Sequence, residues 1–226
     1  MPRAAATVRT VLRPLMRLAW HPRIDGASHV PATGPVILAS NHLSFQDSVL
    51  IPLSAPRPVS FLAKAEYFEG HGAGGLLRRQ FFAGLGAIPV RRGVNREFQS
   101  SLDAALALLE AGGAFGIYPE GTRSRDGRLH RGRTGVAWLA MASGAPVVPV
   151  AVVGTARLGS AAALLPGAAR PAVRFGPVLE FPAHRGNAGS APARRRVTDQ
   201  IMDAIGALSG QQRAHTYNPP PGDEPG

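Results

Sequence analysis

The sequence predicts an α/β protein with a largely parallel central sheet flanked by helices and an amphipathic helix at its amino-terminal end. Short apolar runs alternate with segments of helical periodicity along most of the chain. The runs are apolar at consecutive positions, as in strands that are buried on both faces of a parallel sheet. With 226 residues, 45% of them hydrophobic, the chain can bury one sizeable core. We therefore expect a single domain over residues 1–210.

Residues 1–25 are expected to contain the amphipathic helix. Arginines recur every four residues, while most apolar side chains fall on the other side of a helix. This pattern is typical of a helix in a membrane interface, but also of an ordinary helix packed on its own domain. Under the membrane hypothesis, anionic headgroups bind Arg3, Arg9, Arg13 and Arg17, and the interface takes up Leu12, Leu15, Met16 and Trp20. The arginines interrupt any apolar core of a signal peptide, so we do not expect secretion.

The strands are predicted from apolar runs that end at glycine, proline or polar residues. The first run is bounded by Gly34 and Asn41, and the fifth, residues 146–154, is the most strand-like in the chain. No apolar run approaches the roughly 18 residues of a membrane-spanning helix. In chain order, the expected strands are residues 35–40, 58–64, 87–92, 114–119, 146–154 and 171–181.

The helices are predicted between these strands. The clearest begins at Asn95, a good capping residue, carries apolar residues at helical spacing, and ends at Gly112 and Gly113. Helices are also expected at residues 45–53, 75–82, 136–142 and 194–208. The tail, residues 211–226, contains a run of three prolines and is expected to be disordered.

The composition limits the chemistry of the protein. The absence of cysteine excludes disulfides, thiolate metal ligands and a cysteine nucleophile. Lys and Arg number 25 against 14 Asp and Glu, a formal net charge of +11, and Lys64 is the only lysine. Arginine suits bidentate phosphate binding, so the charge indicates an anionic partner without identifying it. Only 6% of residues are aromatic and no base-stacking motif is visible, so we do not expect nucleic acid to be that partner.

A histidine and an aspartate five residues apart, His42 and Asp47, follow the first predicted strand. Ligands of open α/β sheets bind beyond the carboxyl ends of strands, so His42 should face such a crevice. Along a regular helix the two side chains would point roughly 140° apart. His42 must therefore precede the helix, where Asp47 can orient its ring and stabilise the imidazolium. Ser44 lacks a Gly-x-Ser-x-Gly elbow, which favours a substrate hydroxyl as the nucleophile and disfavours a serine hydrolase.

A second polar segment, residues 118–133, follows another predicted strand. Backbone amides near Gly121, the hydroxyls of Thr122 and Ser124, and Arg123 are suited to surround a phosphate. Glu120 would be repelled by a phosphate, so we expect it to hold an acceptor hydroxyl or an arginine. A solvated turn with surface charges is the plainer interpretation of this segment considered alone.

Four blocks of the sequence resemble, in order, those of the PlsC-like glycerolipid acyltransferases, which include the 1-acylglycerol-3-phosphate acyltransferases. The blocks are residues 41–47, 86–92, 118–124 and 148–151. Four ordered blocks are far more specific than one short motif. The resemblance implies that His42 is a general base and that Asp47 is its partner. It also implies that Arg92, Glu120, Gly121 and Arg123 serve the phosphoglycerol end of the acceptor. We add Thr122, for its hydroxyl in the polar segment, and Lys64, for its position at the end of a predicted strand.

The resemblance further implies a fatty acyl thioester of coenzyme A or acyl carrier protein as donor, no metal, and no cofactor besides this co-substrate. We expect 1-acylglycerol-3-phosphate as the acceptor and phosphatidic acid as the product. Another lysophospholipid, glycerol-3-phosphate or a glycolipid is the alternative acceptor. A non-enzymatic binder of anionic lipid or RNA is the alternative class. The expected location is cytoplasmic, peripheral on the inner face of a membrane that carries anionic lipids.

Overall fold

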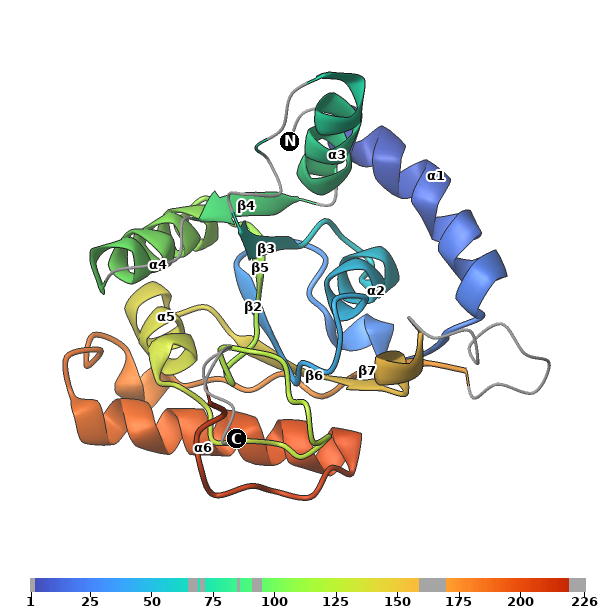
Figure 1. The fold of residues 1–226 in the computed structure, drawn as a ribbon. Coiled ribbons are helices and arrows are strands. Elements are labelled where there is room, and N and C mark those ends of the chain that lie inside the picture. The colour runs from blue at the N-terminus through green and yellow to red at the C-terminus, as the bar shows by residue number, and fades with distance from the viewer. Residues whose placement is uncertain are drawn as a thin grey trace.

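The computed structural model of the chain describes residues 3–64, 69, 72–84, 86–90, 95–158 and 170–219. In this part of the chain, one sheet has the strand order β1-β7-β6-β2-β5-β3-β4 (Figure 1). Its strands are β1 (Arg23–Asp25), β2 (Val36–Ser40), β3 (Ser60–Lys64), β4 (Ala87–Val90), β5 (Ala114–Ile117), β6 (Val147–Val153) and β7 (Ala172–Phe175). Neighbouring strands from β6 to β4 are parallel. The predicted α/β class with a largely parallel sheet is confirmed.

One edge of the sheet departs from the parallel arrangement. Strand β7 pairs with β6 in the antiparallel sense, and β1 then pairs with β7 in parallel. The short β1 was not predicted, because an isolated three-residue strand has no readable periodicity. The strand expected at 171–181 is shorter than predicted, since it ends at Phe175 before Gly176 and Pro177. Beyond them only Leu179 pairs, in an isolated bridge with Val147.

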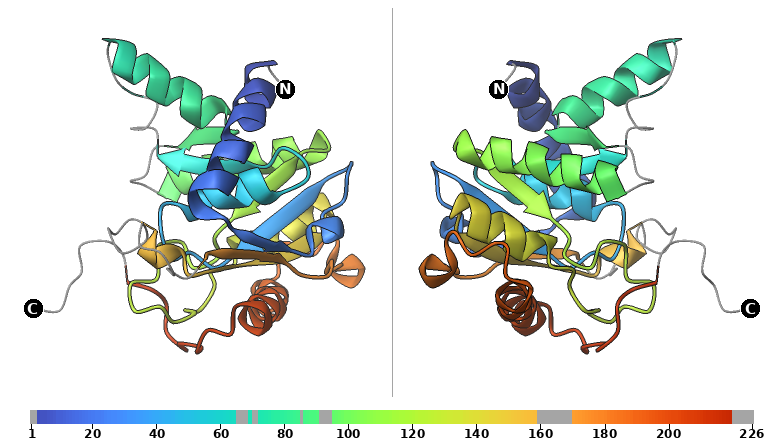
Figure 2. Two further views of the ribbon diagram at one scale, coloured as in Figure 1. Left: turned by 90° about the vertical axis from the view of Figure 1, so that its right-hand side faces the viewer. Right: turned by 90° about the vertical axis from the view of Figure 1, so that its left-hand side faces the viewer.

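Helices cover both faces of the sheet (Figures 1 and 2). One face carries α4 (Asn95–Glu110), α5 (Gly135–Ser143) and α6 (Ala191–Ser209). The other face carries α1 (Arg3–Trp20) and α2 (Asp47–Ser54), and α3 (Gly72–Gly84) contacts α1 and β4. Short 3₁₀ helices lie at Ala27–His29, Thr155–Arg157 and Pro182–His184. None of the described helices has both the length and the apolar character that crossing a bilayer requires.

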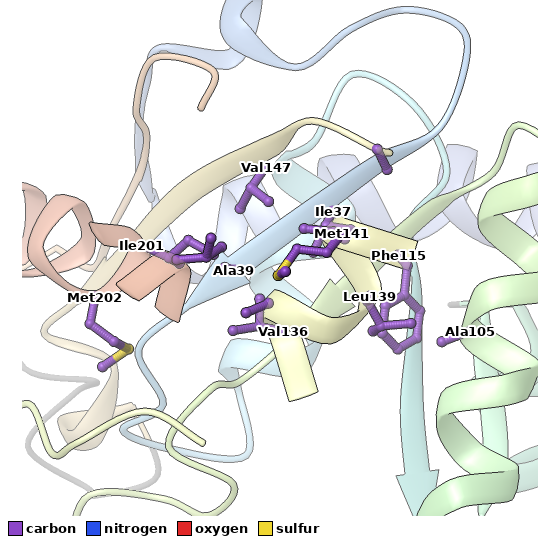
Figure 3. Packing of buried hydrophobic residues seen from close by; sticks show 14 of the residues in the cluster. Ile37, Ala39, Ala105, Phe115, Val136, Leu139, Met141, Val147, Ile201 and Met202 are labelled. Carbon is purple, nitrogen blue, oxygen red and sulfur yellow. The ribbon is translucent and has the colours of Figure 1, made fainter. Parts of the chain in front are cut away.

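Alternate residues of the central strand β2 enter two separate cores. Ile37 and Ala39 belong to the core beneath α4, α5 and α6, whereas Val36 and Leu38 belong to the core beneath α1 and α2. Figure 3 shows the first core, in which Ile37 and Phe115 of the sheet meet side chains of α5 and α6. Every residue of β2 is buried, so this strand is held from both sides and gives a rigid base to the loop that follows it.

The amino-terminal helix corrects one part of the membrane hypothesis. Arg9 is buried and donates to the carbonyl oxygens of Pro52 (2.6 Å) and Ala55 (3.0 Å), and Arg13 donates to those of Leu53 (2.9 Å) and Ala55 (3.1 Å). These carbonyls end α2, where a helix leaves its last acceptors unpaired and favours positive charge. The two arginines therefore bind the protein's own backbone and do not face headgroups. Burial and the neighbouring Arg13 lower the pKa of Arg9 to about 10.

The apolar residues of α1 are divided differently from our expectation. Met16 is buried in the core, and Leu12 and Trp20 pack against it. Of the four residues expected to face the interface, Leu15 (54%) is exposed, and the other exposed apolar side chains are Val11 (54%) and Leu18 (71%). Periodicity identifies the two faces of a helix, but the tertiary packing decides which residues of the apolar half meet the core.

The predicted disorder from residue 211 onward is wrong for residues 211–219. This segment, which we call the carboxy-terminal strap, runs along the loop after β5. Leu129 donates its N–H to Gln212 O (2.9 Å), Ala214 N–H to Leu129 O (2.8 Å), and Arg131 N–H to Thr216 O (2.9 Å). The proline-rich composition concealed this order, because the partners of these backbone groups lie in a distant loop. Residues 220–226 lie outside the described part of the chain.

Candidate active site

The candidate site lies at the carboxyl ends of β2, β5 and β6, which are neighbours in the sheet. Ala39 pairs with Ile117 and Ser40 with Val150, so the loops that leave β2 and β5 begin at the same level. These loops are residues 41–46, the first site loop, and residues 118–134, the second site loop. The sheet thus brings together the two polar segments that the sequence analysis singled out.

In the first site loop, one carboxylate oxygen organises the backbone and the histidine. Asp47 is fully buried, and its Oδ2 accepts from His42 Nδ1 (2.9 Å), Leu43 N–H (2.7 Å) and Ser44 N–H (2.8 Å). The predicted His42–Asp47 hydrogen bond is therefore present, with His42 in the loop and Asp47 as the first residue of α2. Because a carboxylate only accepts, Nδ1 carries the hydrogen, and Nε2 keeps its lone pair.

Tyr118, the first residue after β5, covers one face of the His42 ring. The two ring centroids are 3.8 Å apart and the rings are inclined by 9°. The tyrosine hydroxyl pairs with Ser48 Oγ (3.0 Å), and burial, with the nearby charge of Asp47, raises the pKa of Tyr118 well above its usual range. No role was predicted for Tyr118 from the sequence. Its place directly before Pro119 and Glu120, at the carboxyl end of a predicted strand, was the available signal.

Glu120 makes backbone contacts that its place in the sequence did not indicate. It is only 1% exposed, and its oxygens accept from the backbone N–H groups of His42 (3.2 Å) and His130 (2.9 Å). The carboxyl group therefore joins the two site loops through their backbone. Burial raises its pKa to about 7, although the two backbone hydrogen bonds favour the charged form and oppose this rise.

The other side chains of the second site loop divide into exposed and internal groups. Arg123 is exposed and Thr122 is half-buried, so both remain available to a ligand. The Ser124 hydroxyl, which we expected at a phosphate, instead donates to Arg128 O (2.7 Å) and Asp126 Oδ1 (3.0 Å). Gly121 has φ +80°, and a Cβ there would lie 2.9 Å from Arg133 Nε, so the turn requires glycine.

Two asparagines connect these loops to distant parts of the chain. Asn41 is fully buried and pairs with the backbone of Val152 on β6, accepting its N–H (2.8 Å) and donating to its carbonyl (2.9 Å). Asn41 Nδ2 also donates to Gln211 of the carboxy-terminal strap (2.7 Å). At the other end of the strap, Asn218 donates to the carbonyls of Thr122 (3.3 Å) and Arg123 (2.9 Å). Sequence reasoning missed both, since only the tertiary structure supplies their partners.

Two of the predicted binding residues are not placed. Lys64 is the last residue of β3, but its side chain is outside the described part, and Arg92 falls wholly outside the described residues. Within the described part, the structure brings together His42, Asp47 and the segment from Glu120 to Arg123.

Comparison with known proteins identifies the family. The family profile described as Acyltransferase matches residues 21–153, more than half of the chain, and this range contains both site loops. The chain belongs to the acyltransferase family. The acyltransferase is 31% identical over 136 residues to the 1-acyl-sn-glycerol-3-phosphate acyltransferase BAT2, chloroplastic, of Brassica napus, across 60% of this chain and 38% of the relative. It is 28% identical over 145 residues to the 1-acyl-sn-glycerol-3-phosphate acyltransferase of Bacillus subtilis, across 63% of this chain and 68% of the relative.

The fold of the acyltransferase is also similar to that of a solved structure. The crystal structure of PlsC, the 1-acyl-sn-glycerophosphate (LPA) acyltransferase from Thermotoga maritima, aligns with a TM-score of 0.64 at 20% identity, covering 90% of this chain and 79% of that chain. The likeness therefore extends well beyond the residues that the family profile matches. The chain spans less than two fifths of the length of the Brassica relative.

Proposed function

We propose that this acyltransferase moves a fatty acyl group from an acyl thioester of coenzyme A or acyl carrier protein to the free hydroxyl of 1-acylglycerol-3-phosphate, which gives phosphatidic acid. The observation that carries the proposal is the geometry of His42. Its Nδ1 donates to a buried carboxylate, so Nε2 is free to take a proton. No serine elbow accompanies this base, and the acceptor's own hydroxyl is the nucleophile.

The reaction follows from this geometry. His42 Nε2 removes the proton of the acceptor hydroxyl as its oxygen attacks the thioester carbonyl, and the C–O bond forms. Asp47 stabilises the imidazolium that results, as in other histidine–carboxylate pairs. When the tetrahedral oxyanion collapses, the C–S bond breaks, and the imidazolium returns the proton to the departing thiolate. The products are the acylated acceptor and a free thiol.

The second site loop supports the phosphate end of the proposal. Arg123 is exposed and Thr122 half-buried, in a loop whose turn is set by Gly121. A guanidinium, a hydroxyl and backbone amides match the acceptors of a phosphate monoester. We propose that Arg92 and Lys64, which follow or end neighbouring strands, add positive charge there. Glu120 contributes indirectly, by holding the backbone of both loops together.

The acceptor is proposed from the two similar proteins of Brassica napus and Bacillus subtilis, both of which are named 1-acyl-sn-glycerol-3-phosphate acyltransferases. The same chemistry would serve another lysophospholipid, glycerol-3-phosphate or a glycolipid. The test measures thiol release with each of these acceptors, using palmitoyl-coenzyme A or palmitoyl-acyl carrier protein as the donor. Mass spectrometry identifies the product and so shows which acceptor is used. We expect fastest thiol release, and phosphatidic acid, with 1-acylglycerol-3-phosphate. Thiol release that does not depend on an acceptor would indicate a hydrolase. The absence of thiol release with every acceptor would indicate a protein that binds lipid without catalysis.

We propose that the protein acts as a peripheral protein on the cytoplasmic face of a membrane, docked through α1. The exposed residues Val11, Leu15 and Leu18 lie four and three positions apart, so they form one stripe along the helix. Leu76 of α3, a helix that contacts α1, is also exposed (59%), and Arg17 remains exposed for anionic headgroups. An apolar stripe beside an arginine is suited to an interface between lipid and water.

Leu18→Glu should weaken sedimentation with anionic phosphatidylglycerol vesicles about tenfold, because burial of one leucine stabilises by about 1.5–3 kcal/mol. Activity on a detergent-dispersed short-chain acceptor should persist. The matched control is Val178→Glu, an exposed apolar residue of the loop after β7. Equal vesicle binding by wild type and Leu18→Glu would show that another surface docks.

A further inference from the structure

The His42 ring is held on two sides, and the proposed reaction uses only one of them. At its edge, Nδ1 donates to Asp47 Oδ2 (2.9 Å). On one face, the ring of Tyr118 lies parallel to it at a centroid distance of 3.8 Å. A hydrogen bond at one atom leaves the ring free to tilt about that contact, whereas a flat aromatic surface fixes the plane of the ring. Only the two contacts together determine where Nε2 points.

Tyr118 is itself fixed by two neighbours from other elements. Its hydroxyl pairs with Ser48 Oγ on α2 (3.0 Å), one residue after Asp47. The ring of Phe61 on β3 lies against it at a centroid distance of 5.4 Å, inclined by 32°. Phe61 in turn occupies the space above Gly116, where an added Cβ would fall within the phenyl ring. Phe61, packed over Gly116 of β5, therefore holds the ring of Tyr118 against His42.

We propose that Tyr118 is a positioning residue for acyl transfer, which acts through His42: its ring holds the imidazole in the plane that aims Nε2 at the acceptor hydroxyl, and its face stabilises the imidazolium. The proposal rests on the proposed function in one respect, that His42 is the base. The face of an aromatic ring attracts a cation, and this attraction is strongest where water is excluded. The ring is present before and after proton transfer, but the attraction grows when the imidazole becomes charged, which favours the transition state.

The ring of Tyr118, and not its hydroxyl, carries the proposed role. The hydroxyl is bonded to Ser48 Oγ of α2, whereas the face of the ring lies against His42. Tyr118→Phe keeps the ring and removes only that hydrogen bond. Tyr118→Leu keeps apolar volume but removes the aromatic face. The two variants therefore separate the stack from the hydroxyl and from the filling of space.

The test measures steady-state kinetics of the full chain with palmitoyl-coenzyme A and 1-acylglycerol-3-phosphate, and the NMR resonances of the His42 ring protons, assigned by their loss in His42→Ala. Tyr118→Leu should lower kcat on the order of 10-fold with little change in either KM. Its His42 resonances should move downfield, since the shielding of the stacked ring is lost. Tyr118→Phe should stay within about threefold of wild type and keep the upfield resonances.

Phe61→Leu is the matched control, because it removes an aromatic ring from the same cluster without touching His42. It should lower the melting temperature as Tyr118→Leu does, with a much smaller loss of kcat. A folded Tyr118→Leu protein with wild-type kcat would overturn the proposal, and so would equal loss in the Phe and Leu variants, which would assign the role to the hydroxyl. Wild-type protein without transferase activity would instead refute the proposed function, and the NMR comparison would still report the stack.

Discussion

The two site loops follow strands that are neighbours in the sheet, but the groups proposed to act in them are held by contacts over different sequence distances. In the loop after β2, Asp47 accepts three hydrogen bonds from residues at most five positions away. In the loop after β5, short-range bonds such as that of Ser124 to Arg128 are joined by bonds from far along the chain. Glu120 bonds to His42 across 78 positions, and Asn218 bonds to Thr122 and Arg123 across 96 and 95 positions.

This difference matches the tasks proposed for the two loops. A proton-transfer base needs a fixed direction, and short-range contacts to one buried carboxylate supply it at small cost in chain entropy. A loop that receives a phosphate must keep exposed donors while its backbone stays ordered. The carboxy-terminal strap allows this, since it bonds to the loop's carbonyl and N–H groups and leaves Arg123 exposed.

The largest effect is expected in the first loop. His42→Ala should lower transfer by about 10²–10⁴-fold, because the general base is lost, while the melting temperature changes little. Ser44→Ala is the matched control from the same loop, and it should remain within about tenfold of wild type, since its hydroxyl makes only a 3.4 Å contact with Asp47. The measurement is thiol release with purified proteins. Wild-type turnover by His42→Ala, or complete loss in Ser44→Ala, would refute the proposed mechanism.

An intermediate effect is expected where the two loops meet. Glu120→Gln places an amide NH₂ against one of two backbone N–H donors, so either His42 or His130 loses its acceptor. We expect about tenfold lower kcat/KM, because one of the two hydrogen bonds that join the loops is lost. The exposed Glu180→Gln is the control. Unchanged activity in the Glu120 variant would show that the two loops are positioned independently.

The pKa of Glu120 also predicts how the stability of wild type relative to Glu120→Gln depends on pH. It rises from 4.5 in the unfolded chain to about 7 in the folded protein, so between these values the folded state binds more protons. The contribution of Glu120 to stability is therefore present below pH 4.5 and is lost as the pH rises to 7, by up to about 3 kcal/mol. Urea unfolding at pH 5 and pH 8 should show wild type losing stability relative to Glu120→Gln as the pH rises. A difference that is constant with pH would contradict this assignment.

The smallest effect is expected at the strap. Asn218→Ala removes two hydrogen bonds from the carbonyls of Thr122 and Arg123, which should cost about 1 kcal/mol of stability. Because Arg123 is the proposed phosphate ligand, KM for the acceptor should rise about threefold to tenfold, with KM for the thioester unchanged. The exposed Asn187→Ala should change neither constant. An equal rise in both KM values would mean that the strap supports the whole site and not the second site loop alone.

Much of this protein was determined by the sequence itself. The apolar runs located the central strands, and the alternation of strands and helices determined the parallel sheet, because these patterns repeat over short distances. The pairing of His42 with Asp47 was also readable, since five residues between a strand and a helix allow little other geometry. Glycine at position 121 was part of a recognisable block, and its positive φ gives the reason.

Only the tertiary structure decided the partners of the remaining polar groups. Arg9 and Arg13 bond to the end of α2 and not to headgroups, Glu120 bonds to two backbones, and residues 211–219 are ordered against a distant loop. Tyr118 stacks on His42 because β2 and β5 are neighbours, although 70 or more residues separate them in the chain. An arginine, a carboxylate or an aromatic ring can bond to, or stack on, many different partners equally well. Which partner it meets depends on contacts between segments that are remote in sequence, and no local pattern encodes them.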